Sequence, residues 1–209
     1  MAKQEWKPGN MLYPLPAVLV STRSKAGQDN LMTAAWAGTI CSDPVMLSIS
    51  VRKSRLTYET IMETGCFVVN TTTEEMALAT DYCGVRSGRD EDKWVTMKLE
   101  KEEATHMDCP MCAASPICLE CVVKESKDLG SHTMFIAEVV AVHADEQYIN
   151  ENGRFCFNKS HPLVYSHGEY HALGKYIGKF GYSVRKNQKK KKRTLEKRAK
   201  FRNSSTTKV

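Results

Sequence analysis

Short apolar runs rich in β-branched residues recur along the chain, and they constrain the fold more than any other feature of the sequence. Six of them predict β-strands, at residues 17–22, 31–37, 45–51, 66–70, 117–123 and 135–142. In residues 45–51, branched apolar side chains alternate with Met46, Ser48 and Ser50. A period of two sends alternate side chains to opposite faces of a strand. We therefore expect one face of this strand in the core and the other lining a site.

Helical patterns are few and short. Two groups of residues have the spacing of a helix face: Tyr58, Ile61 and Met62, and Met76, Ala79 and Cys83. Residues 72–75, Thr-Thr-Glu-Glu, have the sequence of a capping box at the start of the second helix. A parallel sheet would need long helices alternating with the strands. The sequence therefore predicts a mainly β fold, an antiparallel barrel or sandwich with a few short helices.

The positive charge of the chain is concentrated at its carboxyl-terminal end. The net charge is +6, yet residues 185–209 hold 12 Lys or Arg and one acid, which leaves about −5 on the remainder. We predict one domain over residues 1–185 and a basic tail over residues 186–209 that is disordered when free. Because the tail has few aromatic residues to stack on bases, a solubilising tail is favoured over a nucleic-acid-binding arm.

The sequence indicates neither export nor membrane insertion. The first ten residues lack the apolar core of a signal peptide, and no run approaches the roughly 20 apolar residues of a membrane-spanning helix. We expect a cytoplasmic protein whose eight cysteines are reduced thiols.

Four of the cysteines form two C-x-x-C pairs, Cys109 with Cys112 and Cys118 with Cys121. Four thiolates can hold a structural zinc ion, but the five residues between the pairs are fewer than the usual spacing of about 12 to 20. Cys118 and Cys121 also fall in a predicted strand, where a separation of three residues directs them to opposite faces. We therefore expect structural thiols and no metal site, with a metal or redox role as the alternative.

Common catalytic and nucleotide-binding motifs are missing. The chain contains no G-x-G-x-x-G, no G-x-x-x-x-G-K-[ST], no G-x-S-x-G and no H-E-x-x-H. Dinucleotide binding of the Rossmann type, P-loop hydrolysis, the serine-hydrolase elbow and the common zincin site all lack their signatures. A bound nucleotide would have to be held in another way.

Three consecutive segments carry the residues of a candidate binding site. Residues 52–57, Arg-Lys-Ser-Arg-Leu-Thr, place three cations and two hydroxyl groups at the start of a predicted helix, a combination that suits a phosphate dianion. The preceding strand offers Ser48 and Ser50 on one face. Trp36, with Ala34 and Ala35 before it, offers an aromatic wall and room for a flat ring.

Together these segments resemble the flavin reductase-like family with its FMN-binding split barrel, particularly its flavoredoxin branch. Residues 82–94, 130–139 and 170–185 fit the same family, and the resemblance spans residues 14–185. It implies a mainly β split barrel of Greek-key type that binds FMN non-covalently, at the seam of a homodimer. It also implies electron transfer from NAD(P)H or a reduced protein donor to a flavin or another acceptor. An electron carrier without NAD(P)H activity is the alternative.

The resemblance also implies the site residues. Residues matching family positions that line the FMN site are Asn30, Trp36 and Thr57. Further expected FMN contacts are Met32, Thr33, Ala34, Ala35, Ser48, Ile49, Ser50, Arg52, Lys53, Ser54, Arg55 and Tyr165. Lys93 and His132 are the expected catalytic residues, because a cation beside the reduced, anionic flavin would raise its reduction potential. Ordering a nicotinamide or flavin substrate is the alternative role for His132.

Overall fold

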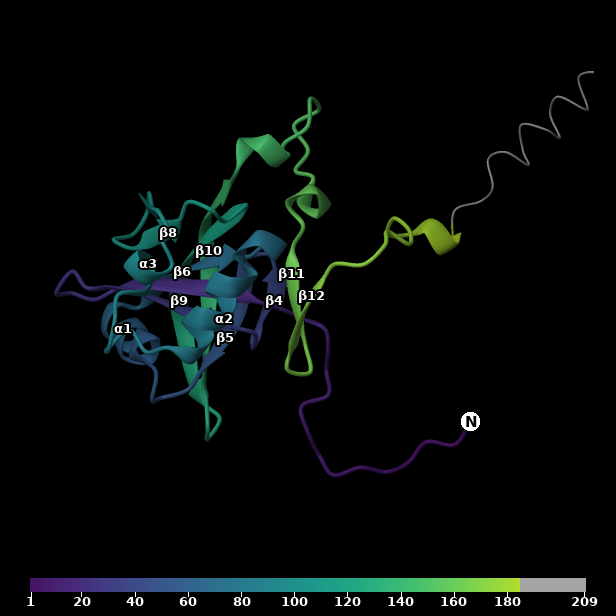
Figure 1. Ribbon diagram of the computed structural model, residues 1–209, viewed down its shortest axis with the longest axis horizontal. Helices are drawn as coiled ribbons and strands as arrows, with labels where there is room; N and C mark the ends of the chain where they lie inside the picture. The colour runs from purple at the N-terminus through teal and green to yellow at the C-terminus, as the bar shows by residue number, and fades with distance from the viewer. Residues whose placement is uncertain (185–209) are drawn as a thin grey trace, which may run out of the picture. The chain divides into compact units, whose positions relative to one another are not determined.

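The computed structural model describes residues 1–184 (Figure 1). Backbone contacts divide the chain into two units, Met1–Leu173 and Gly174–Val209, and the strands found in residues 1–184 all belong to the first. The described part of the second unit contains one short 3₁₀ turn, Tyr182–Val184. The basic tail expected at residues 186–209 lies outside the described residues, and the domain boundary expected at residue 185 stays a prediction.

The first unit is built on a seven-stranded antiparallel sheet, which confirms the mainly β prediction. In spatial order its strands are β3 (Asp29–Ala34), β2 (Val18–Arg23), β6 (Cys66–Thr71), β9 (Ile117–Asp128), β10 (Thr133–Ala144), β5 (Val45–Val51) and β4 (Ala37–Ser42). The neighbours β2 and β6, like β5 and β10, are distant in sequence, so the sheet contains the long connections that a Greek-key arrangement requires.

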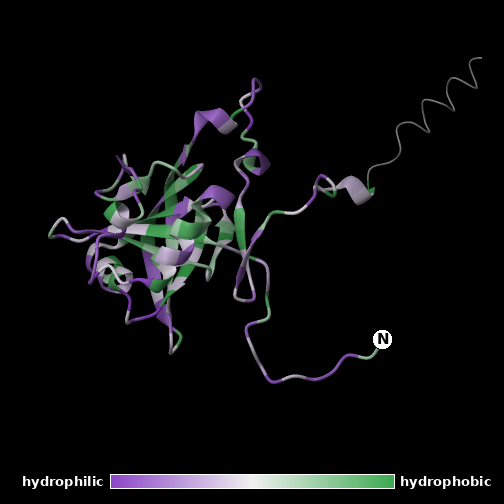
Figure 2. Ribbon diagram, viewed as in Figure 1, coloured by the Kyte–Doolittle hydropathy of each residue, from purple (hydrophilic) through white to green (hydrophobic). Residues whose placement is uncertain are grey.

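Alternate side chains of the strands are apolar and form the main core. Leu47, Ile49 and Val51 of β5 are buried in one apolar cluster with Phe67 of β6 and Phe135 of β10, as the period of two predicts. Figure 2 shows apolar residues concentrated on these strands. Burial of this surface supplies the main driving force for folding the unit.

A second apolar cluster covers the other face of β3. Leu31 packs there with Cys83 of α2 (Ala77–Val85) and Trp94 of α3 (Lys93–Thr96), while the neighbouring Met32 belongs to the main core. The strand is therefore buried on both faces, which fixes its position. The expected inner face of the second helix is confirmed, because Ala79 and Cys83 are both buried.

Both predicted helices are present, but two local details of the predictions differ in the structure. The 3₁₀ turn Glu74–Met76 that precedes α2 has no side-chain cap, because Thr72 instead donates its hydroxyl hydrogen bond to the carbonyl of Ala17, at 2.7 Å. In α1 (Leu56–Thr64) the buried residues are Thr57, Thr60 and Ile61. They have the expected spacing shifted by one position, which leaves Met62 53% exposed.

The strand predicted over residues 31–37 is interrupted. It ends at Ala34, and a tight turn held by the Ala37 amide donating to the Ala35 carbonyl, at 2.9 Å, leads into β4. Trp36 therefore lies in a bend and not in a strand. Its carbonyl accepts a hydrogen bond from the Ser50 amide at 2.8 Å, which ties the bend to β5.

Two smaller sheets complete the unit. One contains β1 (Leu15–Pro16), β11 (Leu163–Ser166) and β12 (Glu169–Ala172), and the other pairs β7 (Lys101–Glu103) with β8 (Pro110–Cys112). The turn between β11 and β12 uses His167 and Gly168, both with positive φ, 51° and 91°. Within residues 1–184 no helix is long and apolar enough to cross a membrane.

The two C-x-x-C pairs are free thiols in the packed interior. Cys118 lies in a cluster with Cys109, and Cys121 lies in the main core, so their predicted placement on opposite faces of β9 is confirmed. Burial raises the pKa of both Cys118 and Cys121 to about 12. Among the described residues no three His, Cys, Asp or Glu side chains are arranged to hold a metal ion.

Candidate functional site

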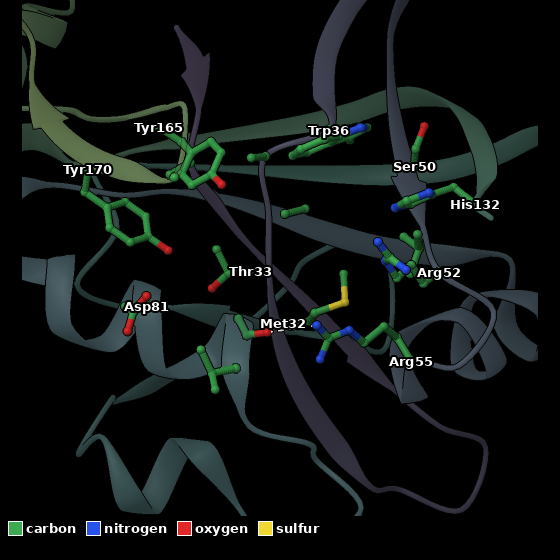
Figure 3. Close-up of a pocket in the computed structure, with 17 residues that line it drawn as sticks. Met32, Thr33, Trp36, Ser50, Arg52, Arg55, Asp81, His132, Tyr165 and Tyr170 are labelled. Carbon is green, nitrogen blue, oxygen red and sulfur yellow. Dashed lines mark hydrogen bonds between the residues drawn. The ribbon is translucent and has the colours of Figure 1, made fainter. Parts of the chain in front are cut away.

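A cavity of about 360 Å³ lies beside β3, the strand at one edge of the seven-stranded sheet (Figure 3). Its volume falls within the range of roughly 300 to 1,000 Å³ typical of small-molecule sites. Residues 32–34 of β3 line it without interruption, followed by residues 35 and 36 of the bend. Because successive side chains of a strand point to opposite faces, an uninterrupted series means that the cavity runs along the edge of the strand. That edge carries backbone N–H and C=O groups that the sheet does not pair.

One end of the cavity is cationic. Arg52 follows β5, and Arg55 is the residue that precedes α1. The guanidinium of Arg55 donates to the carbonyl of Gly84 at 3.0 Å, which anchors it to the end of α2. Ser50 and His132 lie at the same end. Burial and the charge of Arg52 lower the pKa of His132, so its imidazole is mostly neutral at pH 7.

Aromatic rings form one wall of the cavity. The rings of Trp36 and His132 are parallel, with an interplanar angle of 1° and centroids 6.3 Å apart. Tyr165 of β11 lies 6.4 Å from Trp36 at 50°, and Tyr170 of β12 lies 5.7 Å from Tyr165 at 66°. The β11–β12 hairpin therefore extends the wall that Trp36 begins. The wall offers a flat ring several apolar faces.

The end of the cavity away from the arginines is lined by Asp81 of α2 and by Tyr170 (Figure 3). Burial and the neighbouring carboxylate of Asp81 raise the pKa of the Tyr170 phenol to about 12. Thr33 lies between the two ends, and its hydroxyl donates to the carbonyl of Thr80 in α2. The cavity thus has a cationic end and an acidic end.

A second, much smaller cavity of about 10 Å³ adjoins the first and shares Met32 and Arg55 with it. This is about the space of one water molecule. Asn30 donates from Nδ2 to Thr57 Oγ1 at 2.8 Å, and its buried Oδ1 has no hydrogen-bond partner in residues 1–184. Lys93 is 3% exposed and donates from Nζ to the carbonyls of Arg86 and Cys83, at 3.1 and 3.4 Å. Burial and the charge of Arg55 lower the pKa of Lys93.

The structure brings most of the expected site residues to these two cavities. The large one is lined by Met32, Thr33, Ala34, Ala35, Trp36, Ser50, Arg52, Arg55, His132 and Tyr165. The small one is lined by Asn30, Thr57 and Lys93, so Lys93 lies behind Arg55 and not on the wall of the large cavity.

Four expected contacts line neither cavity. Ile49 is fully buried in the main core, because it lies on the apolar face of β5. Lys53 forms an ion pair with Asp128 at the end of β9. The carbonyl of Ser54 accepts a hydrogen bond from Arg89 at 2.9 Å. Ser48 pairs with Gly38 and Ile136 inside the sheet, further from the cavity than Ser50.

Several lining residues were missed by the sequence reasoning. They are Ala17, Val51, Asp81, Gly84, Val85, Gly168 and Tyr170. Tyr170 pairs directly with Tyr165 across the β11–β12 hairpin. The Ser-His-Gly-Glu sequence of the turn is the signal for this hairpin, and recognising it would have placed Tyr170 opposite Tyr165. No local sequence feature predicts that Asp81 lines the cavity. It lies in a helix whose hydrophobic periodicity indicates only which side chains are buried.

Comparison with known proteins decides the family. A sequence model described as "Flavin reductase like domain" matches residues 11–174. The chain belongs to the flavin reductase-like family. The family and the split-barrel fold predicted from the sequence are thereby confirmed.

Solved structures of the family resemble this chain over most of its length. Flavoredoxin of Desulfovibrio vulgaris (Miyazaki F) is 31% identical, with a TM-score of 0.82 over 88% of this chain and 100% of that one. Flavoredoxin from Methanosarcina acetivorans is 32% identical, with a TM-score of 0.79 and the same coverage. An uncharacterized protein of Archaeoglobus fulgidus is 33% identical over 135 residues, which are 64% of this chain and 75% of that protein.

The closeness of Gly88 to Asn30 generates a prediction for stability. A Cβ atom at Gly88 would lie 2.0 Å from Asn30 Oδ1, and Asn30 is buried and bonded to Thr57. We expect Gly88→Ala to lower the free energy of unfolding by about 1 to 3 kcal/mol, as overpacking does, measured by urea denaturation. The matched control is Gly38→Ala, where nothing lies within 4 Å of the added Cβ. Equal stability of the two variants would show that Asn30 is not held as described.

Proposed function

We propose that this protein binds one FMN non-covalently in the cavity beside β3. It uses the cofactor to pass electrons from NAD(P)H or a reduced protein donor to a flavin or another acceptor. The observation that carries the proposal is the pairing of a two-arginine end with an aromatic wall along the free edge of a strand. The likeness to two proteins named flavoredoxins supports it.

The cationic end fits the phosphate of FMN. Arg52 and Arg55 line the cavity, and Arg55 immediately precedes the nine-residue helix α1. Guanidinium groups donate paired hydrogen bonds to phosphate oxygens, and the start of a helix adds free N–H groups and a favourable dipole. The hydroxyl of Ser50 adds a further donor at the same end.

The remainder of the cavity fits the flat ring system of FMN. Trp36 and Tyr165 provide apolar faces, and the edge of β3 provides unpaired backbone N–H and C=O groups for the polar edge of the ring. Ala34 and Ala35 keep the adjacent space open because their side chains are small. The donors, acceptors and faces present therefore match the chemical groups of FMN.

The bound cofactor supplies the redox chemistry, because it exchanges one or two electrons while the protein binds and tunes it. The residues of this chain have supporting roles. Arg52 and Arg55 hold the phosphate, and Lys93 adds positive charge behind Arg55. His132, mostly neutral at pH 7, has a hydrogen-bonding nitrogen at the cationic end; Ser131 Oγ lies 2.9 Å from its other nitrogen, Nδ1. A homodimer and a cytoplasmic location stay predictions from the sequence.

If the arginine end binds the phosphate of FMN, neighbouring cationic side chains should differ in how much they contribute to FMN binding. We expect Arg52→Ala and Arg55→Ala each to weaken FMN binding by about 1 to 3 kcal/mol, the value of charge-assisted hydrogen bonds, measured by titrating the apoprotein with FMN. Lys53→Ala is the matched control, because Lys53 is engaged by Asp128 and lines neither cavity. A loss at Lys53 as large as the losses at the arginines would contradict the assignment.

The electron-transfer proposal predicts that the FMN-loaded protein is reduced by a physiological donor. Under anaerobic conditions we expect its visible flavin absorbance to bleach with NADH, NADPH or a reduced low-potential electron-transfer protein. Bleaching by either nucleotide identifies a reductase, and bleaching by the protein donor alone identifies an electron carrier. If only a chemical reductant such as dithionite bleaches the band, the protein binds FMN without this function.

A further inference from the structure

The turn that carries His132 is held by the carboxylate of Asp128, the last residue of β9. Residues 129–132 join β9 to β10, and the amide of Leu129 donates to the carbonyl of His132 at 2.9 Å. Within this turn the amide of Gly130 donates to Asp128 Oδ1 at 2.9 Å, and Gly130 has the positive φ of 91° that favours glycine. The turn is therefore closed by its backbone and fixed by one side chain.

The other oxygen of the same carboxylate binds a second turn. Asp128 Oδ2 accepts a hydrogen bond from the ammonium group of Lys53 in an ion pair. Lys53 lies in the turn between β5 and α1, which is closed by the Arg55 amide donating to the Arg52 carbonyl at 3.0 Å. That turn carries the two arginines of the cationic end. Asp128 thus connects the turn of His132 with the turn of the arginines.

This connection matters because the imidazole of His132 has no anchor outside its own turn. In residues 1–184 the one hydrogen-bond partner of its side chain is Ser131 Oγ, 2.9 Å from Nδ1. Ser131 belongs to the same turn, so this contact moves with the turn. The His132 ring lies parallel to the ring of Trp36, at an interplanar angle of 1°. The orientation of the turn therefore decides how the imidazole meets the cavity.

The exposure of the Lys53–Asp128 pair separates positioning from stability. The two side chains are 48% and 59% exposed. Exposed ion pairs add little to the free energy of folding, because water screens them and holding two long side chains costs entropy. The pair can still select one orientation of a short turn, since Lys53 and the Gly130 amide bind the same carboxylate. Removing it should move the turn without unfolding the protein.

We propose that Asp128 is a positioning residue for the reaction: it holds the turn of His132 against the turn of the arginines and thereby orients the His132 imidazole at the cavity. This inference rests on the proposed function, because it gives His132 a part in electron transfer through bound FMN. Asp128 lines neither cavity, so it acts through His132.

The first test follows the His132 ring in the protein without FMN. Its ring protons lie beside Trp36, so their chemical shifts in a proton–carbon correlation NMR spectrum report on the parallel arrangement of the two rings. We expect Asp128→Ala to shift these resonances, which are assigned by their loss in His132→Ala. Glu138→Ala should leave them unchanged. Glu138 is the matched control, because its carboxylate pairs with Lys124 across the same hairpin without bonding the turn.

Two further variants separate the two bonds of Asp128. Asp128→Asn keeps an oxygen for the Gly130 amide and removes the charge that pairs with Lys53, and Lys53→Ala removes the same ion pair from the other side. We expect both to shift the His132 resonances by a similar amount, smaller than the shift in Asp128→Ala. All these variants should unfold at the urea concentration that unfolds the wild type, because the pair is exposed.

The second test measures reduction of the FMN-loaded protein under anaerobic conditions, with the donor that bleaches the wild type. We expect Asp128→Ala to slow this reduction by about tenfold, a size typical of coupling between interacting residues, while FMN still saturates the variant. In a His132→Ala background the same substitution should change the rate by less than about twofold, because Asp128 acts through His132. Independent losses from the two substitutions would overturn the inference.

The outcomes distinguish failure of the inference from failure of the proposed function. If the wild type does not bind FMN, or no donor reduces it, the proposed function fails and the inference fails with it. If the wild type is reduced and Asp128→Ala is reduced equally fast, the inference alone is overturned, whether or not the His132 resonances move. Shifted resonances together with slower reduction that depends on His132 are the result that supports it.

Discussion

The free edge of β3 is the constraint on which the site depends. The seven-stranded sheet ends at this strand, so its backbone groups on one side are not used by the sheet. Both faces of the strand are buried, Met32 in the main core and Leu31 under α2 and α3. An edge held from both sides cannot move to close the sheet, and it remains available to a ligand. The cavity beside β3 is therefore held rigidly and has a polar backbone edge as one side.

Several contacts hold the two sides of this cavity in place relative to each other. The Ser50 amide donates to the Trp36 carbonyl at 2.8 Å, which joins the bend after β3 to β5. Arg55 donates to the Gly84 carbonyl at 3.0 Å, which joins the start of α1 to α2. The cations, the aromatic wall and the strand edge are thus held in place before any ligand arrives. Preorganised groups bind a ligand at a lower entropic cost than groups that must be ordered.

Regular patterns in the sequence predicted the strands and helices of the fold well. Where the backbone is irregular, the prediction from sequence failed. The alternation in residues 45–51 correctly predicts that Ile49 lies on the core face of a strand. The family resemblance nevertheless counted Ile49 among the FMN contacts, and it does not line the large cavity. A motif identifies a segment, but the pleat decides which of its side chains face the site. Trp36 was assigned to a strand because its neighbours are apolar, and the turn at Ala35 has no glycine or proline to mark it.

Residues brought to the site by distant segments were the hardest to predict. Asp81 and Tyr170 come from a helix and a hairpin whose contacts with β3 depend on the tertiary fold. Lys93 was expected beside the cofactor because of its place in a motif. In the structure its ammonium group donates to the carbonyls of Cys83 and Arg86, and its contact with the cofactor stays a prediction. Burial and backbone hydrogen bonding determine that position, and neither leaves a periodic signal in the sequence.

Amide hydrogen exchange with and without FMN tests the central claim most directly, because it reports on the strand edge itself. The account predicts that FMN slows exchange of those amides of residues 29–36 that do not donate to β2, together with amides at the start of α1. Exchange along β9 and β10, which are paired on both sides, should change little. FMN binding that protects other segments and leaves the edge of β3 unchanged would contradict the account.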